Sequence, residues 1–252
     1  MSKNRILILD GFRGLSILIV VLFHFFTRGT IPYSSINLYP YGNYFNFFPN
    51  GLLGVKFFFM ISGFVIFMTL EKTASFKSFI LNRIIRLFPT MFIISLATFL
   101  IFLLIGSNYI FYHDNTNLKY FFTSIFFISP SFLKLFHIES NYLNGSYWSL
   151  WPEIQFYFFF LAIIYYSSKN KKFEVIIFIS FLMILFNYFF NRTNLPFTLN
   201  GTFSKKLVLI FNVFNLLVYL QHFIAGVIWY FIYTNKYSTK KLFLNIILLL
   251  LI

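Results

Sequence analysis

Cysteine is absent from the 252-residue sequence, and acidic residues are almost absent, with six Asp and Glu in total. The lack of cysteine excludes disulfide bonds, thiolate catalysis and every metal site built on cysteine. Charged residues of both signs make up 10% of the chain, whereas a typical soluble domain contains about 25%. So little charge excludes a soluble enzyme, a disordered chain and an acidic binding module.

Apolar side chains are present in excess: they account for 59% of the residues and include 42 phenylalanines. A water-soluble fold of this length could not remove so many apolar side chains from solvent. The 20 Lys and Arg, which give a formal charge of +14, are scattered between apolar runs, and this argues against nucleic-acid binding. The composition therefore indicates an integral membrane protein.

Mostly apolar runs of about 20 residues, the length needed to cross a bilayer, recur along the whole chain. We therefore expect an all-α polytopic bundle, about seven spans in a single domain over residues 1–252, and no soluble domain. The last run is still apolar at Ile252, so we expect the chain to be incomplete at its C-terminus. The expected spans are Ile6–Phe26, Gly51–Leu70, Leu87–Ile105, Ile154–Ser167, Phe173–Phe190, Leu207–Tyr233 and a run from Leu242.

Basic residues near span ends predict the side of the membrane on which each loop lies. Lys3 and Arg5 precede the first span, and basic clusters follow the second, fourth and sixth spans. All these groups fall on one side only if Tyr120–Phe136, which could be a span, a re-entrant piece or a surface helix, does not cross the bilayer. We therefore expect a multi-pass protein of the cell (inner) membrane with a cytoplasmic N-terminus and with Gly106–Pro152 outside.

The first expected span holds three ionisable side chains, Asp10, Arg13 and His24, where lipid disfavours charge. A charge near the centre of a span costs roughly 2.5–3.5 kcal/mol, so such residues usually face a cavity and serve a function. At about 100° per residue the three share one stripe of a helix, and roughly 16 Å along its axis separates Arg13 from His24. The alternative is a structural Asp10–Arg13 pair and an interfacial histidine.

Another acidic residue, Glu153, directly follows Pro152 at the start of an expected helix. Proline suits the first turn of a helix, and the helix dipole favours a carboxylate there. An acid at a helix start, flanked by interfacial Trp and Tyr, is common by itself. The expected topology nevertheless places it at the outer side, level with His24, so the two side chains could meet.

Two further patterns are explained more simply by structure than by function. Small residues at Gly51, Gly54, Ser62 and Gly63 favour close helix packing. We expect the basic stretch Lys77–Arg86 to form an inner loop that signals orientation, with an anionic ligand as the functional alternative because arginine binds phosphates well. The histidines outside the spans lack metal-ligand spacing, and we expect no metal site.

Four short motifs follow one another over roughly residues 6–165. They are Leu9-Asp10-Gly11-Phe12-Arg13-Gly14 with Leu22-Phe23-His24, Gly54–Gly63, Asn82–Pro89 and Trp148–Tyr157. Together they resemble the acyltransferase-3 family of membrane O-acyltransferases, which carries a basic residue, ten positions and then a histidine. The sequence departs from the family pattern at Lys56, where many members carry an acidic or neutral residue, and at Ile154, which replaces a frequent second Glu.

The resemblance implies transfer of an acyl group, usually acetyl, from acyl-CoA to a hydroxyl of a carbohydrate or cell-envelope glycan. Acyl-CoA is a donor substrate, and we expect no permanently bound cofactor. His24 is then the expected general base, or the carrier of an acyl-histidine intermediate, and Glu153 would orient its ring. Arg13, Arg83 and Arg86 would bind the donor, and Asp10, Ser62, Trp148 and Tyr157 would support the site.

Two other interpretations remain open. Transporters of glycans or lipid-linked oligosaccharides also place Arg, Asp and His along a membrane pathway. The chain could also be an inactive, truncated fragment of the acyltransferase, because it ends inside an apolar run. Transfer from labelled acetyl-CoA distinguishes the enzyme from both.

Overall fold

The computed structural model describes residues 6–27, 51–105, 117–167 and 212–234, with isolated positions between 174 and 185 and between 240 and 247. All regular elements within these residues are helical. The chain divides into two compact units, which are Met1–Met68 with His222–Ile246 (unit 1) and Thr69–Gln221 with Ile247–Ile252 (unit 2). The all-helical prediction is therefore confirmed for the described part of the chain.

Four described helices are long and apolar enough to cross a membrane, with mean hydropathies from 1.6 to 2.4. They are α1 (Leu7–Phe26), α2 (Gly51–Lys72), α3 (Phe76–Ile105) and α11 (Leu216–Thr234). They coincide with four of the expected spans as candidate membrane helices, whereas most of Phe173–Phe190 and the run from Leu242 lie outside the described residues. The predicted total of about seven spans is not confirmed.

The start of α3 corrects one prediction. Lys77–Arg86 was expected in a loop, but it forms the first turns of a helix that begins at Phe76 and continues through Pro89. This stretch contains no glycine, and its Lys, Arg, Leu and Ile residues are compatible with a helix. The basic residues Lys77, Arg83 and Arg86 therefore belong to α3 and not to a loop before it.

Unit 1 packs α1 against α2 through glycines. A β-carbon at Gly54 would lie 2.8 Å from the Ser16 carbonyl oxygen of α1, and one at Gly51 would overlap with the Phe23 ring. Since Gly51 lies near the end of α1 and Phe57 packs on Phe12 near its start, the two helices run antiparallel. The predicted packing role of these glycines is confirmed.

In the same unit α11 runs parallel to α2. A β-carbon at Gly63 would overlap with the Phe223 carbonyl, and one at Gly226 would overlap with the Met60 carbonyl. Phe67 packs on Phe231 further along both helices, with ring centroids 5.2 Å apart. The shared direction agrees with the expectation that both helices run toward the basic side.

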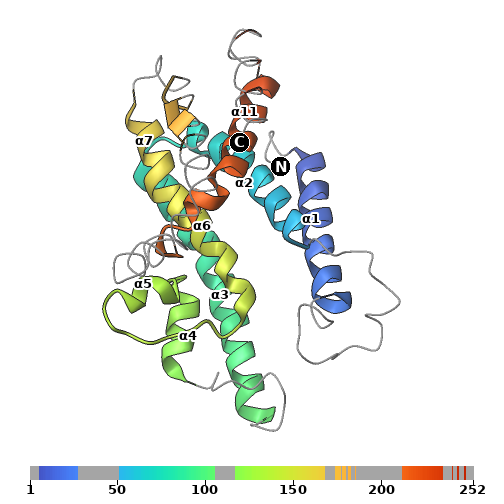
Figure 1. Ribbon diagram of the computed structural model, residues 1–252, viewed down its shortest axis with the longest axis vertical. Helices are drawn as coiled ribbons and strands as arrows, with labels where there is room; N and C mark the ends of the chain where they lie inside the picture. The colour runs from blue at the N-terminus through green and yellow to red at the C-terminus, as the bar shows by residue number, and fades with distance from the viewer. Residues whose placement is uncertain are drawn as a thin grey trace. The chain divides into compact units, whose positions relative to one another are not determined.

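In unit 2 a second helical run returns along α3 (Figure 1). It consists of α6 (Leu150–Gln155), one π-helical turn η2 (Phe156–Phe160) and α7 (Leu161–Tyr166). Ring contacts join Phe79 to Tyr157 and Phe76 to Tyr165, so the run is antiparallel to α3. This run begins four residues before the predicted span, and at 1.5 Å per residue it is about 25 Å long.

The ambiguous stretch Tyr120–Phe136 contains two short helices, α4 (Leu118–Ile125) and α5 (Pro130–Lys134). Neither approaches the roughly 20 residues that a span needs. Phe121 packs on Phe92 and Phe99 of α3, and Phe126 packs on Phe88, so the stretch lies along the second half of α3 (Figure 1). These short helices agree with the condition on which the predicted orientation depends, and the orientation itself stays a prediction.

Candidate functional site

The first candidate group lies on α1 in unit 1. Because this helix is unbroken from Leu7 to Phe26, the predicted stripe is present, and roughly 16 Å along the axis separates Arg13 from His24. Asp10, Arg13 and His24 are all half-buried. The small residues Gly11 and Gly14 beside Arg13 have open space around them, since a β-carbon at either would meet no atom within 4 Å.

The His24 ring is oriented by its own helix. Its Nδ1 lies 2.8 Å from the Val20 carbonyl oxygen, and the Phe23 ring stands edge-on to it at 5.5 Å. A carbonyl can only accept a hydrogen bond, so Nδ1 is the donor, and in the singly protonated ring Nε2 is then the acceptor. The contact with Val20 therefore leaves Nε2 as the nitrogen that can take up a proton.

The second candidate group lies in unit 2 and joins three predicted site residues. The Tyr157 hydroxyl donates a hydrogen bond to Glu153 Oε1. The Arg83 guanidinium lies 5.3 Å from the Phe79 ring centroid and 5.8 Å from that of Tyr157. Glu153, Tyr157 and Arg83 are all buried, and Glu153 lies within electrostatic range of Arg83. We call these three residues the buried triad.

The buried triad overturns the predicted depths of two of its members. The sequence-based topology put Arg83 near the inner face and Glu153 near the outer face. In the structure both contact Tyr157, so they share one level beside α3. The reason is that Leu118–Ser149 packs along the second half of α3, and the next helix therefore starts beside its middle.

The two arginines of the basic stretch differ in their surroundings. Arg83 is 6% exposed, whereas Arg86 lies on an exposed face of the same helix. Burial beside the rings of Phe79 and Tyr157 limits the access of a phosphate to the Arg83 guanidinium, whereas an exposed guanidinium is accessible. Arg86 is therefore better suited than Arg83 to hold an anionic ligand.

A clamp at the start of α11 was not anticipated from the sequence. Gln155 Oε1 accepts a hydrogen bond of 3.0 Å from the Leu216 backbone N–H, and Gln155 Nε2 donates to the Val213 carbonyl oxygen. Trp151 Nε1 donates to the same carbonyl at 2.7 Å, and Trp148 packs on the Tyr219 ring. The first N–H groups of a helix have no hydrogen-bond partner within the helix. Gln155 supplies the partner for one of these groups, the N–H of Leu216.

A signal for this clamp was present in the sequence. Gln155 and Trp151 belong to the motif Trp148–Tyr157, in which only Trp148, Glu153 and Tyr157 were expected to contribute. Alternate residues of this motif face different neighbours. Glu153 and Tyr157 meet Arg83, whereas Trp151 and Gln155 hold the start of α11.

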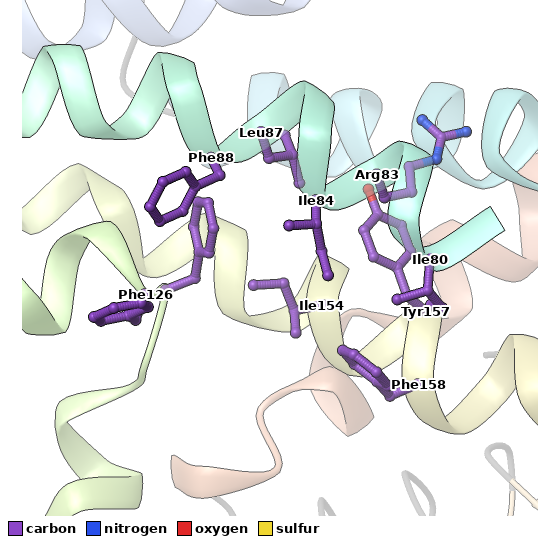
Figure 2. A pocket seen from close by; sticks show the side chains of 10 residues that line it. Ile80, Arg83, Ile84, Leu87, Phe88, Phe126, Ile154, Tyr157 and Phe158 are labelled. Atoms are coloured by element: carbon purple, nitrogen blue, oxygen red, sulfur yellow. The ribbon is translucent and has the colours of Figure 1, made fainter. Parts of the chain in front are cut away.

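Two apolar cavities accompany these groups. In unit 1, α1, α2 and α11 enclose about 460 Å³ near Phe12 and Trp229. In unit 2, a cavity of about 430 Å³ has Arg83 and Tyr157 in its wall. Figure 2 shows Ile84 and Ile154 pointing toward one another across it, while the Arg83 guanidinium points away.

The predicted contact between His24 and Glu153 would join residues of the two different units. His24 lies in unit 1 and Glu153 in unit 2, so their meeting stays a prediction. Ser62 is buried in α2 and Trp148 is half-buried. Within the ranges that the structure describes, no group of three His, Cys, Asp or Glu could hold a metal ion.

Comparisons with known proteins show which family and which relative the chain is similar to. A family model described as "Acyltransferase domain" matches residues 6–252. A relative from Acidianus two-tailed virus, named "Putative acetyltransferase ORF330", is 26% identical over 96% of this chain, which spans 63% of that relative's length. A search of solved structures gives no match.

Proposed function

Because this chain belongs to the acyltransferase-3 family, we propose that it transfers an acyl group from acyl-CoA to a hydroxyl of an extracytoplasmic carbohydrate. The family match over residues 6–252 carries the proposal. The name of the viral relative supports acetyl as the acyl group. In this proposal the protein lies in the cell membrane with its N-terminus in the cytoplasm, where acyl-CoA is made.

His24 is the proposed general base. With Nδ1 bonded to the Val20 carbonyl, Nε2 takes the acceptor hydroxyl proton while that oxygen attacks the thioester carbonyl carbon. Collapse of the tetrahedral intermediate breaks the C–S bond, and the departing CoA thiolate takes the proton from the imidazolium. In the alternative route Nε2 attacks the thioester itself and forms an acyl-histidine.

Glu153 is proposed to stabilise the positively charged His24 ring. Within the described part of the chain, Tyr157 bonds to Oε1 of this carboxylate, which leaves Oε2 for another donor. The Arg83 guanidinium lies 5.8 Å from the Tyr157 ring centroid and within electrostatic range of Glu153. We therefore assign Arg83 to positioning this carboxylate.

Arg13 and Arg86 are the proposed contacts for the donor phosphates. Arg86 is exposed, so its guanidinium can form paired hydrogen bonds with phosphate oxygens. Arg13 lies roughly 16 Å from His24 along α1, a separation that a long, thin pantetheine arm can bridge. Asp10, Ser62 and Trp148 keep the supporting roles expected from the sequence.

The proposal is tested by NMR of polysaccharide O-acetyl content in a deletion strain complemented with the wild type, His24→Gln or His222→Gln. His222 is a matched control, since it is a histidine within a candidate span, α11, and is not part of the proposed site. We expect His24→Gln to abolish O-acetylation at equal expression and His222→Gln to retain most of it. Near-normal acetylation in His24→Gln would reject the role of His24.

A second assay separates an acyltransferase from a transporter. Membranes that contain the protein are incubated with labelled acetyl-CoA, and label in the carbohydrate fraction is measured. A transporter would move glycans without transferring label, whereas the proposed enzyme transfers label in a manner that depends on His24.

A further inference from the structure

The face of α3 that points away from the unit 2 cavity carries polar residues. Asn82, Arg86 and Thr90 are four residues apart, so each lies about 40° around the helix from the one before it and roughly 6 Å further along the axis. All three side chains are exposed. Figure 2 shows Ile84 pointing into the cavity, and Arg86 lies about 160° around the helix from it. We call Asn82, Arg86 and Thr90 the polar stripe of α3.

A proline leaves a backbone acceptor open beside this stripe. Pro89 lies inside α3, about 60° around the helix from Arg86, and its nitrogen has no hydrogen to donate. In a regular α-helix the N–H at this position donates to the carbonyl oxygen four residues earlier, which here belongs to Ile85. The Ile85 carbonyl therefore lacks its usual donor. Because Pro89 is exposed, this open acceptor lies on the exposed side of α3, between Arg86 and Thr90 along the axis.

The Thr90 hydroxyl is an open donor on the same side. A threonine inside a helix can donate to the carbonyl four residues earlier, as Thr98 of the same helix does to Ile94 at 2.8 Å. Within the described part of the chain the Thr90 hydroxyl makes no hydrogen bond. Thr90 lies near the middle of α3 (Phe76–Ile105), a candidate membrane span. Lipid offers no hydrogen bonds, so polar groups at such a position need a partner other than lipid.

The order of charge and hydrogen-bonding groups along α3 selects this partner. Arg86 offers a cation, and one turn further along the helix an accepting carbonyl and a donating hydroxyl lie on the same side. Acyl-CoA presents complementary groups in the same order. Its diphosphate is followed by a short carbon chain, comparable in length to one helical turn, and then by an amide that both donates and accepts. A neutral sugar would leave the charge of Arg86 without a counterpart.

We propose that Thr90 and the Ile85 carbonyl bind the first amide of the pantetheine arm, an inference that rests on the proposed acyl transfer. The Ile85 carbonyl accepts from the amide N–H, and the Thr90 hydroxyl donates to the amide carbonyl. Arg86 binds the diphosphate one turn earlier, and Asn82 lies on the nucleotide side of it. Pro89 thus has a binding role, because it frees a backbone carbonyl for the donor substrate.

The test measures the affinity of the full chain in nanodiscs for two probes by isothermal titration calorimetry. The probes are CoA and ADP, which shares the adenosine diphosphate of CoA but lacks the pantetheine arm. Thr90→Val removes the hydroxyl at nearly constant size, and Thr98→Val is the same change at a hydroxyl that is already bonded. Thr90→Val should weaken CoA binding about three- to tenfold, the effect of one hydrogen bond, and leave ADP binding unchanged. Thr98→Val should change neither affinity.

A second variant tests the backbone acceptor. Pro89→Ala returns an N–H to the Ile85 carbonyl, so it should weaken CoA binding by a similar factor and again leave ADP binding unchanged. The Tm should not fall, because alanine favours a helix interior and proline disfavours it. Affinity lost without loss of stability separates a binding role from a structural one.

The outcomes separate this inference from the proposed function. Arg86→Ala should weaken both CoA and ADP. Wild-type affinity for CoA in Thr90→Val or in Pro89→Ala, or an equal loss for CoA and ADP, would overturn the proposal and indicate that the polar stripe contacts another helix or water. A wild-type protein that binds neither probe would contradict the proposed function, and the inference with it.

Discussion

The close contact of α2 and α11 gives the sharpest prediction about stability. A β-carbon at Gly63 would overlap with the Phe223 carbonyl, which belongs to the backbone of the neighbouring helix and cannot rotate away. A β-carbon at Gly14 in α1 would meet nothing within 4 Å. Gly63→Ala and Gly14→Ala are therefore the same chemical change inside a helix, one at a contact and one in open space.

The magnitudes follow from this comparison. Replacing glycine by alanine inside a helix favours folding by about 1 kcal/mol, and this gain is common to both variants. Overpacking against a neighbour costs about 1–3 kcal/mol, and only Gly63→Ala has this cost. The helix term cancels in the difference, so Gly63→Ala should be about 1–3 kcal/mol less stable than Gly14→Ala.

Thermal unfolding of the purified protein in detergent measures this difference. A domain of 150–250 residues shifts its Tm by roughly 2–4 °C for each kcal/mol. Gly63→Ala should therefore melt roughly 2–12 °C below Gly14→Ala. Equal Tm values for the two variants would show that α2 and α11 do not approach each other at Gly63, and would refute the packing of unit 1.

Two further predictions concern unit 2. Arg86→Ala should raise the KM for acyl-CoA and leave kcat unchanged. Arg83→Leu should lower kcat and leave the KM unchanged, and Arg83→Lys should restore part of the lost kcat. The opposite pattern of kcat and KM would reverse the roles of the two arginines. Gln155→Leu removes the partner of the Leu216 N–H, which should cost about 1–3 kcal/mol and appear as a lower Tm in the same assay. An unchanged Tm would mean that the clamp at α11 contributes no stability.

Much of the fold was predictable because helix and lipid impose strong local patterns. The spans α1 and α2 were predicted to within two residues from apolar length alone. The packing role of Gly63 followed from residue size, because only small side chains allow two backbones to approach closely. The family was predicted from motif order, and the match over residues 6–252 confirms it.

The buried triad was not predictable as a group because tertiary packing between helices brings its members together. Hydropathy placed the start of the Glu153 helix at a membrane face, whereas its level beside α3 depends on how Leu118–Ser149 packs. Burial of Arg83 likewise depends on the rings of Phe79 and Tyr157, which are distant from each other in sequence. The helical position of each residue was predictable, but its neighbours on other helices were not.

The π-helical turn Phe156–Phe160 has a consequence for the tolerance of this segment to length changes. Such a turn holds one residue more than an α-helical turn, so the residues after it keep the faces they would have in an α-helix that is one residue shorter. Deleting one residue within this turn would therefore restore a regular α-helix, and both Glu153 and Tyr165 would keep their faces, the latter against Phe76. A deletion within Leu161–Tyr166 would instead turn the residues after it by about 100° around the axis. Natural sequence variants should therefore lose single residues within Phe156–Phe160 more readily than within Leu161–Tyr166.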